Sequence, residues 1–140
     1  MNFTEMDYNA LAEKIIQACT EVHNELGPGL LQSVYENYTI DTLKRYGLIV
    51  NNQVKIPVTF QGKKLGKEFI IDLLVEDTII LELKTVDALL PIHEAQLETN
   101  LKLADKRLGL LINFNVPLLK QGIKRKINGN LSSAKLEKTL

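Results

Sequence analysis

The amino-acid sequence predicts a mixed α/β fold of the α+β kind, with a central β-sheet flanked by helices. Three observations lead to this prediction. Apolar residues recur at helical spacing over the first third of the chain, short β-branched runs follow, and a further helical segment then precedes another apolar run. Helices and a sheet each have an apolar side, and packing them in layers buries both sides together.

Two helices are expected first. The apolar positions of residues 8–26 have helical spacing, and Gly27 supplies a stop at the end of this segment. These periodic positions are Leu11, Ile15, Cys19, Val22 and Leu26. The composition of residues 27–29 (Gly-Pro-Gly) indicates a turn, and a second helix is then expected over residues 31–46, closed by Gly47.

Three strands are expected next. Residues 54–60 alternate between apolar and polar types, and Pro57 within them suggests an edge strand or a bulge. Residues 68–75 (EFIIDLLV) and 78–84 (TIILELK) are apolar, β-branched runs separated by Glu76-Asp77. This pattern predicts a well-buried antiparallel hairpin.

The remainder of the chain adds a helix and further strands. Pro91 suits the first turn of a third helix, which is expected to run to about Lys106. Residues 108–114 (LGLLINF) form another apolar strand, and residues 123–127 are a candidate final strand. We expect a single domain over residues 1–140, with residues 130–140 as a loosely packed tail.

The composition limits the class of protein. Hydrophobic residues make up 45% of the chain and charged residues 24%, which is ordinary for a globular domain. The formal net charge is zero, so nucleic acid could be bound only through local basic patches. With one cysteine, no signal-peptide pattern and no apolar run long enough to span a bilayer, we expect a cytoplasmic protein without a membrane partner.

Three charged residues lie inside the predicted buried hairpin. Asp72 is surrounded by isoleucine and leucine, and Glu82 and Lys84 alternate with leucines on the second strand. Ionised groups in such surroundings are unfavourable unless they are paired or bind a metal. Because residues two apart on a strand share a face, Glu82 and Lys84 point the same way.

The register of the hairpin decides whether Asp72 joins them. If Val75 pairs with Ile79, Asp72 lies opposite Glu82, and directly opposed Cβ atoms are about 4.5–5.5 Å apart. A strict two-residue turn at Glu76-Asp77 would instead place Asp72 across from Leu81, and a bulge would then be required. Both registers are compatible with the sequence.

Two facing carboxylates repel each other, and a divalent cation such as Mg²⁺ or Mn²⁺ resolves this repulsion. Asp72 and Glu82 are therefore the candidate metal ligands, with the backbone carbonyl of Leu83 as a further one. A metal beside Lys84 suits phosphodiester hydrolysis, because the metal acidifies water and the lysine can hold or deprotonate that water or neutralise developing charge.

Helical residues are further candidates for the site. Glu36, on the second helix, could supply a third metal-binding carboxylate, and Gln96, on the third, could orient water or phosphate. His93 and Glu98 lie on other parts of that helix and are weaker candidates, with His93 expected to be a first-turn polar residue.

Simpler interpretations exist for each charged group. Lys84 could form a cross-strand ion pair with Asp72 or Glu82, without any catalytic role. Two basic clusters are either solvated faces or phosphate-contacting patches. They are Lys63, Lys64 and Lys67, and Lys120, Lys124, Arg125 and Lys126.

Over roughly residues 8–130 the sequence resembles the GxxExxY family, which is assigned to the PD-(D/E)XK nuclease superfamily. The matching stretches are GPGLLQSVYE at 27–36, IDLLVEDTIILELKTV at 71–86, HEAQLETNLKL at 93–103 and LGLLINFNVPLLKQGIKR at 108–125. The resemblance implies a restriction-endonuclease-like core. It also implies metal-ligand roles for Asp72 and Glu82, a catalytic role for Lys84, and a place for Gln96 as the glutamine of the following helix.

The family's naming motif is altered at one position. Gly29 and Tyr35 match it, but Gln32 stands where the glutamate belongs. A neutral amide is a weaker metal ligand, so either Glu36, one helical turn further on, carries the acidic role or the activity is weakened.

Two functions follow as hypotheses. The first is a Mg²⁺-dependent (or Mn²⁺-dependent) nuclease acting on nucleic acid, with DNA favoured over RNA. The second is a weak or inactive module of the same fold that binds nucleic acid or a protein partner. A homodimer built on the exposed sheet edge would help so small a nuclease to grip a duplex.

Overall fold

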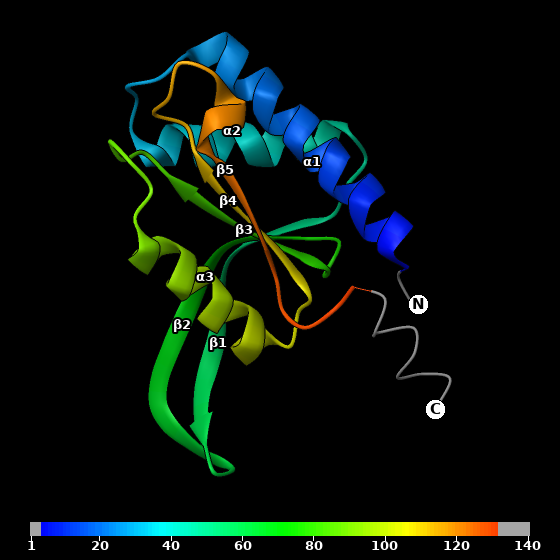
Figure 1. Ribbon diagram of the computed structural model, residues 1–140, viewed down its shortest axis with the longest axis vertical. Coiled ribbons are helices and arrows are strands. Elements are labelled where there is room, and N and C mark those ends of the chain that lie inside the picture. Colours follow the sequence, from blue (N-terminus) through cyan, green and yellow to red (C-terminus); the bar gives the residue numbers. More distant parts are fainter. Residues whose placement is uncertain (1–3, 132–140) are drawn as a thin grey trace.

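The computed structural model describes residues 4–131, which form three α-helices, one short 3-10 helix and five strands (Figure 1). In chain order they are α1 (Glu5–Leu26), α2 (Gln32–Arg45), β1 (Val50–Phe60), β2 (Lys63–Val75), β3 (Ile79–Lys84), α3 (Pro91–Ala104), β4 (Leu108–Asn113), η1 (Leu119–Gly122) and β5 (Ile123–Ile127). This order confirms the predicted succession of helices and strands, including the final strand.

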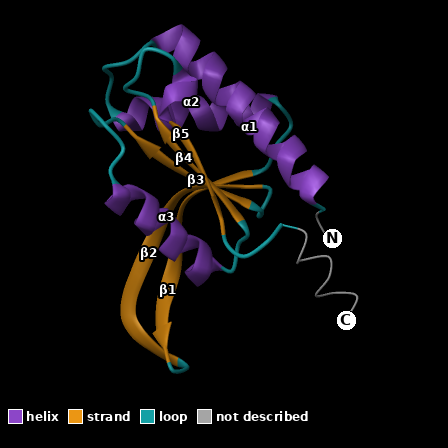
Figure 2. Cartoon of the chain, in the orientation of Figure 1, coloured by secondary structure: helices purple, strands orange, loops and turns teal. Residues whose placement is uncertain are grey.

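The strands form one mixed sheet in the order β1-β2-β3-β4-β5. Only β3 and β4 pair in parallel, and α3 is the connection between them, whereas the other neighbours are antiparallel. Helices α1 and α2 cover one face of the sheet and α3 covers the other (Figure 2). The predicted central sheet with flanking helices is therefore confirmed.

Two apolar clusters fill the space between these layers. The larger lies under α1 and α2 and contains Ile15, Leu43, Leu81, Leu83 and Phe114 among its buried members. The smaller lies under α3. It consists of Ile71, Leu74, Ile80, Leu97, Leu101 and Leu111. The central strands are thus buried on both faces, as their near-continuous apolar sequence predicts.

Helix α1 begins three residues earlier than its apolar period predicts. The side chain of Thr4 accepts a hydrogen bond from the amide of Asp7, and the Asp7 carboxylate accepts one from the amide of Thr4 at 2.8 Å. This reciprocal capping satisfies amides that have no partner within the helix. At the other end Gly27 has a φ of 69°, and its amide donates to the carbonyl of His23.

Strand β1 is an edge strand, and its pairing with β2 shifts between Pro57 and Thr59. Proline cannot donate to a strand ladder, so both parts of the prediction for Pro57 are confirmed. Gln53 in the same strand has a φ of 50°. On either side of it, Val50 packs under α1 and α2 whereas Val54 packs under α3.

The hairpin of β1 and β2 extends beyond the rest of the sheet as a two-stranded arm (Figure 1). Strand β3 pairs with β2 only at residues 73–75, so the outer part of β2 has β1 as its partner. Residues 61–70 are all exposed. Strand β2 begins five residues earlier than its apolar run predicts, because pairing with β1 rather than burial forms its first part.

The predicted tail falls, from residue 132 onward, outside the described residues. Leu131, just before them, is buried in the larger core cluster. Cys19 is also buried there, as expected, and burial raises the pKa of its thiol to about 12. Among the described residues, no helix is long and apolar enough to cross a membrane.

Candidate active site

The hairpin register places the two predicted acids opposite each other. Val75 pairs with Ile79 and Leu73 with Leu81, and the same register continued outward aligns Asp72 with Glu82. The connection contains Glu76, Asp77 and Thr78 rather than the two-residue turn that the sequence also allowed. Glu76 and Asp77 both have positive φ, and the amide of Thr78 donates to the carbonyl of Val75 at 2.9 Å.

Strand β3 sends alternate side chains to opposite faces of the sheet. Leu81 and Leu83 enter the larger core, whereas Glu82 and Lys84 face α3. There they line a cavity of about 220 Å³ together with Asp72. The full lining is Phe69, Ile70, Asp72, Glu82, Lys84, His93, Gln96 and Asn100. All four residues predicted as catalytic, Gln96 included, therefore meet in one cavity.

Backbone and side-chain donors hold the two carboxylates. The amide of Leu83 donates to Oδ2 of Asp72 at 2.9 Å, which joins the two strands where their ladder has ended. Nδ2 of Asn100 donates to Oε1 of Glu82 at 2.9 Å. Glu82 is only 7% exposed, so this amide partly replaces the water that the carboxylate has lost.

The electrostatics of the cavity favour a protonated Glu82. Burial raises the pKa of Glu82 to about 8, and the charge of Asp72 and a hydrogen bond with the Asp72 side chain act in the same direction. The hydrogen bond from Asn100 and the positive charge of Lys84 oppose them. Two carboxyls that share so small a space cannot both ionise readily without a further cation.

Lys84 is half-buried at the end of β3, where the chain is held by buried Asn113. The Asn113 side chain accepts from the amide of Val86 at 3.0 Å and donates to its carbonyl at 2.8 Å. Phe114 also donates its amide to the carbonyl of Lys84 at 2.9 Å. These bonds fix the direction in which the chain leaves the site.

Helix α3 contributes one face to the cavity. His93, Gln96 and Asn100 are three or four residues apart, so they lie along one side of the helix. The expectation that His93 lies on another part of the helix is wrong. His93 does, however, have the expected first-turn role, because its Nδ1 accepts from the amide of Leu90 at 2.9 Å.

Asn100 is a residue of the cavity that was not predicted from the sequence. Its position four residues after Gln96 could have marked it, because residues four apart share a helix face. Oδ1 of Asn100 is buried and has no hydrogen-bond partner among the described residues. An unpartnered acceptor beside two carboxylates is unfavourable in an apolar surrounding, and it suits a ligand that brings donors, such as hydrated metal.

Glu36 does not line the cavity. Its Oε1 accepts from Nε2 of Gln53 at 2.8 Å, and Gln53 belongs to the edge strand β1. Glu36 is therefore bonded to β1 and lies outside the cavity. Within residues 4–131, no three His, Cys, Asp or Glu side chains are grouped so that they could hold a metal.

Tyr35 of the naming motif has an architectural role. Its hydroxyl donates to the carbonyl of Gly27 and accepts from the amide of Leu30, and its ring stacks on Phe114 at 4.5 Å. It thereby anchors the turn between α1 and α2 to the core. Glu98, on the opposite side of α3 from the cavity, pairs with Lys126 on β5, as Glu94 does at 2.6 Å.

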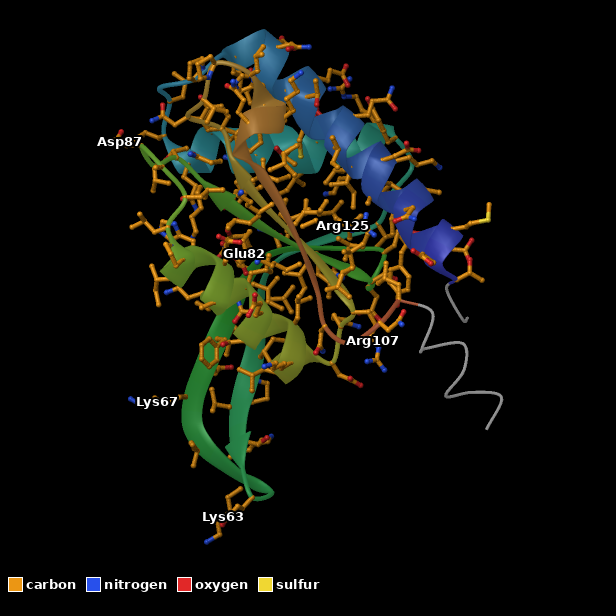
Figure 3. The ribbon with its side chains drawn as sticks, viewed as in Figure 1. Lys63, Lys67, Glu82, Asp87, Arg107 and Arg125 are labelled. Carbon is orange, nitrogen blue, oxygen red and sulfur yellow. The ribbon has the colours of Figure 1, made fainter. Side chains whose placement is uncertain are left out.

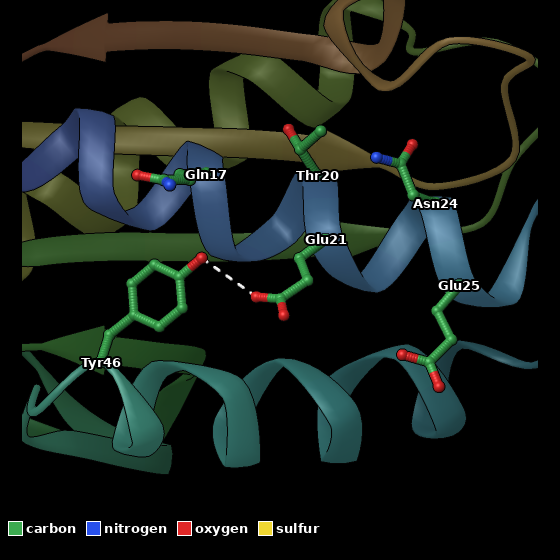
Figure 4. A pocket seen from close by; sticks show the side chains of 6 residues that line it. All are labelled: Gln17, Thr20, Glu21, Asn24, Glu25 and Tyr46. Carbon is green, nitrogen blue, oxygen red and sulfur yellow. Dashed lines mark hydrogen bonds between the residues drawn. The ribbon is translucent and has the colours of Figure 1, made fainter.

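A wider, shallow depression lies away from these acids, on α1 and the end of α2 (Figure 4). It is lined by Gln17, Thr20, Glu21, Asn24, Glu25 and Tyr46. The Tyr46 hydroxyl donates to Glu21 at 3.0 Å. With exposed acids and no converging basic or nucleophilic groups, this depression offers no chemistry comparable to that under α3.

Comparison with known proteins agrees with this geometry. The family model of the PD-(D/E)XK nuclease superfamily matches residues 9–126, and the chain belongs to this superfamily. No curated protein and no solved structure matches the chain. Nucleases of this superfamily generally depend on a divalent metal ion.

Proposed function

We propose that the chain is a Mg²⁺- or Mn²⁺-dependent nuclease of the GxxExxY type that hydrolyses phosphodiester bonds in nucleic acid. The observation that carries the proposal is the meeting of Asp72, Glu82 and Lys84 in one cavity on the α3 face of a buried sheet. A purely structural strand would place apolar residues at these positions. Superfamily membership gives the reaction class.

The donors present fit a hard divalent cation. Asp72 and Glu82 supply carboxylate oxygens, and the carbonyl of Leu83 faces the same strand gap as the Leu83 amide that binds Asp72. When bound, the cation would neutralise the two carboxylates, acidify water and stabilise negative charge on the phosphate. Glu36, engaged with Gln53, is assigned a place outside this ligand set.

The remaining residues would act on water and phosphate. Lys84 would hold or deprotonate the attacking water, or neutralise charge that develops on the phosphate oxygens. Gln96, exposed on α3, would orient water or phosphate at the cavity mouth. Asn100 would favour the ionised form of Glu82 by donating to it, and so assist the cation in holding this carboxylate.

A nicking assay tests the proposal. Purified protein with Mg²⁺ or Mn²⁺ should nick plasmid or RNA substrates, and Lys84→Ala should reduce the rate by at least about 100-fold. Lys102→Ala, which removes an exposed lysine of α3, is the matched control and should cleave normally. Equal activity in Lys84→Ala and the wild type would discard the catalytic assignment.

A second candidate function is a binding module without catalysis. It is favoured by Gln32 at the motif's glutamate position and by a cavity to which, among the described residues, Asp72 and Glu82 alone contribute carboxylates. Thermal unfolding discriminates the two. A nuclease should show a rise in melting temperature with millimolar Mg²⁺ or Mn²⁺, and the binding module should show none.

A further inference from the structure

The β1–β2 arm is a surface without an assigned partner. Beyond the point where β3 leaves β2, the ribbon has no third strand, and residues 61–70 are exposed on both of its faces. Figure 3 shows Lys63 at its tip and Lys67 pointing away from its side. Folding alone does not require so long an exposed ribbon, because past Ile56, which packs against the smaller cluster, its described side chains belong to neither core cluster.

The arm carries local positive charge in a chain whose net charge is zero. Its charged residues are Lys55, Lys63, Lys64, Lys67 and Glu68. Neighbouring residues of a strand point to opposite faces, so Lys63 and Lys64 put charge on both faces of the ribbon. None of these lysines forms an ion pair within the part of the chain that the structure describes.

The second basic cluster contrasts with the arm. Lys126 pairs with Glu94 at 2.6 Å and with Glu98 at 3.4 Å, and Arg125 donates to Asn9 at 2.6 Å. These cations hold β5 against α3 and α1. In the arm, by contrast, Lys63, Lys64 and Lys67 are all exposed and form no ion pair among the described residues, so the charge of the whole cluster is available to a partner.

We propose that the β1–β2 arm grips double-stranded DNA by lying in its major groove, and so directs the phosphate backbone to the acids under α3. The major groove of B-form DNA admits a two-stranded ribbon, and lysines on such a ribbon reach phosphates of the groove walls. The choice of nucleic acid as partner rests on the proposed function.

The dimensions and continuity of the arm support this placement. Strand β2 alone contains both Lys63 and Asp72, nine residues apart, which corresponds to about 30 Å of extended chain. This length spans roughly nine base pairs at about 3.4 Å per step. Phe69 and Ile70 line the cavity and belong to the arm, so the arm leads directly into the site.

Two other partners fit the arm less well. The major groove of A-form RNA is deep and narrow, so a ribbon with side chains on both faces does not enter it. A second copy of the chain could add strands to the open edges of the ribbon. Lysines on an edge oppose such pairing, and the three lysines of β2 would meet three more in a symmetric pair formed through β2.

The test compares two triple variants that change charge equally. The arm variant is Lys63→Gln, Lys64→Gln and Lys67→Gln, and the control variant is Lys14→Gln, Lys44→Gln and Lys120→Gln, all exposed. Binding to a fluorescein-labelled DNA duplex is measured by anisotropy in EDTA, between about 50 and 200 mM salt. The same measurement is made with an RNA duplex and with single-stranded DNA of the same sequence.

The arm variant should bind duplex DNA about 10- to 100-fold more weakly than the wild type at about 100 mM salt. Its slope of log affinity against log salt should fall by about 2–3, because each lost phosphate contact removes about 0.9. The control variant should change affinity by less than about 3-fold. RNA duplex and single strands should bind the wild type more weakly and respond little to the arm variant.

Cleavage separates this inference from the proposed function. The arm variant should cleave duplex DNA poorly at about 100 mM salt. It should hydrolyse bis(4-nitrophenyl) phosphate at the wild-type rate, because a diester so small cannot occupy the cavity and contact the arm at the same time. If the wild type cleaves neither substrate but binds DNA through the arm, the proposal that the chain is a nuclease fails, whereas the proposal that the arm binds DNA is upheld.

Three results would overturn the arm's role. The first is an equal loss of DNA affinity in the arm and control variants, which would assign binding to net charge. The second is an equal dependence of RNA-duplex binding on the arm. The third is a wild-type protein that sediments as a dimer and an arm variant that sediments as a monomer but binds DNA with unchanged affinity. That result would make the arm an interface between two copies of the chain.

Discussion

The two faces of the sheet differ although the same strands form both. Toward α1 and α2, β3 presents Leu81 and Leu83 to the larger apolar core. Toward α3, the same strand presents Glu82 and Lys84 to a cavity, beside a cluster of only six buried apolar residues. The first face therefore contributes most of the apolar burial, and the second combines a smaller apolar cluster with charged groups.

The faces also differ in what their covering helices contribute. The larger cluster includes apolar residues of both α1 and α2, whereas α3 supplies Asn100 to the cavity as well as Leu97 and Leu101 to the smaller cluster. Asn100 donates to Glu82 there. Helix α3 is therefore both a structural cover and part of the candidate site.

The largest effect should come from breaking the apolar face. Leu81→Ala removes a fully buried side chain from the larger core and should lower the free energy of unfolding by about 2–5 kcal/mol. Urea unfolding with an unchanged slope measures this loss. Leu65→Ala, at an exposed position of the arm, is the control and should change the free energy by less than about 0.5 kcal/mol.

The next effect concerns the polar face and pH. In the metal-free protein, burial raises the pKa of Glu82 from 4.5 to about 8. Between these pH values the folded chain keeps a proton that the unfolded chain has lost, so the free energy of unfolding falls as pH rises. Glu82→Gln should abolish this fall and stabilise the metal-free protein by about 1–3 kcal/mol at alkaline pH.

Adding metal should reverse the way in which the free energy of unfolding of the wild type depends on pH. Cation binding requires ionised carboxylates, so saturating Mg²⁺ should stabilise the protein more as pH rises through the pKa of Glu82. The Glu82→Gln variant should gain little stability from Mg²⁺. A metal-free pH profile identical in the variant and the wild type would show that another group is responsible.

The smallest effect should come from the contact between α3 and β3. Asn100→Ala removes the donor to Glu82 but also the unpartnered Oδ1, so stability should fall by only about 0.5–1.5 kcal/mol. The pH midpoint of the metal-free stability curve should move upward, because the hydrogen bond favours ionised Glu82. Thr99→Ala, at an exposed neighbouring position, should leave the midpoint in place.

Parts of the site could be predicted because they depend on local rules. The shared face of Glu82 and Lys84 follows from strand alternation alone. The position of Asp72 could not be decided, because Thr78 is β-branched and suits either the turn or the first residue of a strand. The positive φ values of Glu76 and Asp77, which fix the longer connection, are not encoded by residue type.

Other parts could not be predicted because they depend on contacts between distant segments. Helical spacing places His93 and Asn100 on the same face as Gln96, but only the packing of α3 on the sheet brings that face to the acids. The hydrogen bond between Glu36 and Gln53 likewise depends on the placement of α2 beside β1. The exposed arm could not be predicted from the sequence either. The first residues of β2 are exposed and lack a burial pattern, and they form a strand because they pair with β1.

The order of elements, the buried central strands and the charged residues that interrupt them can be predicted from the amino-acid sequence. Apolar periodicity indicates these features, and periodicity is a local property of the chain. The hairpin register, the orientation of the α3 residues toward the cavity and the projection of the β1–β2 arm are instead set by tertiary packing. Each of these depends on which surfaces pack together, and packing joins residues that the sequence keeps far apart.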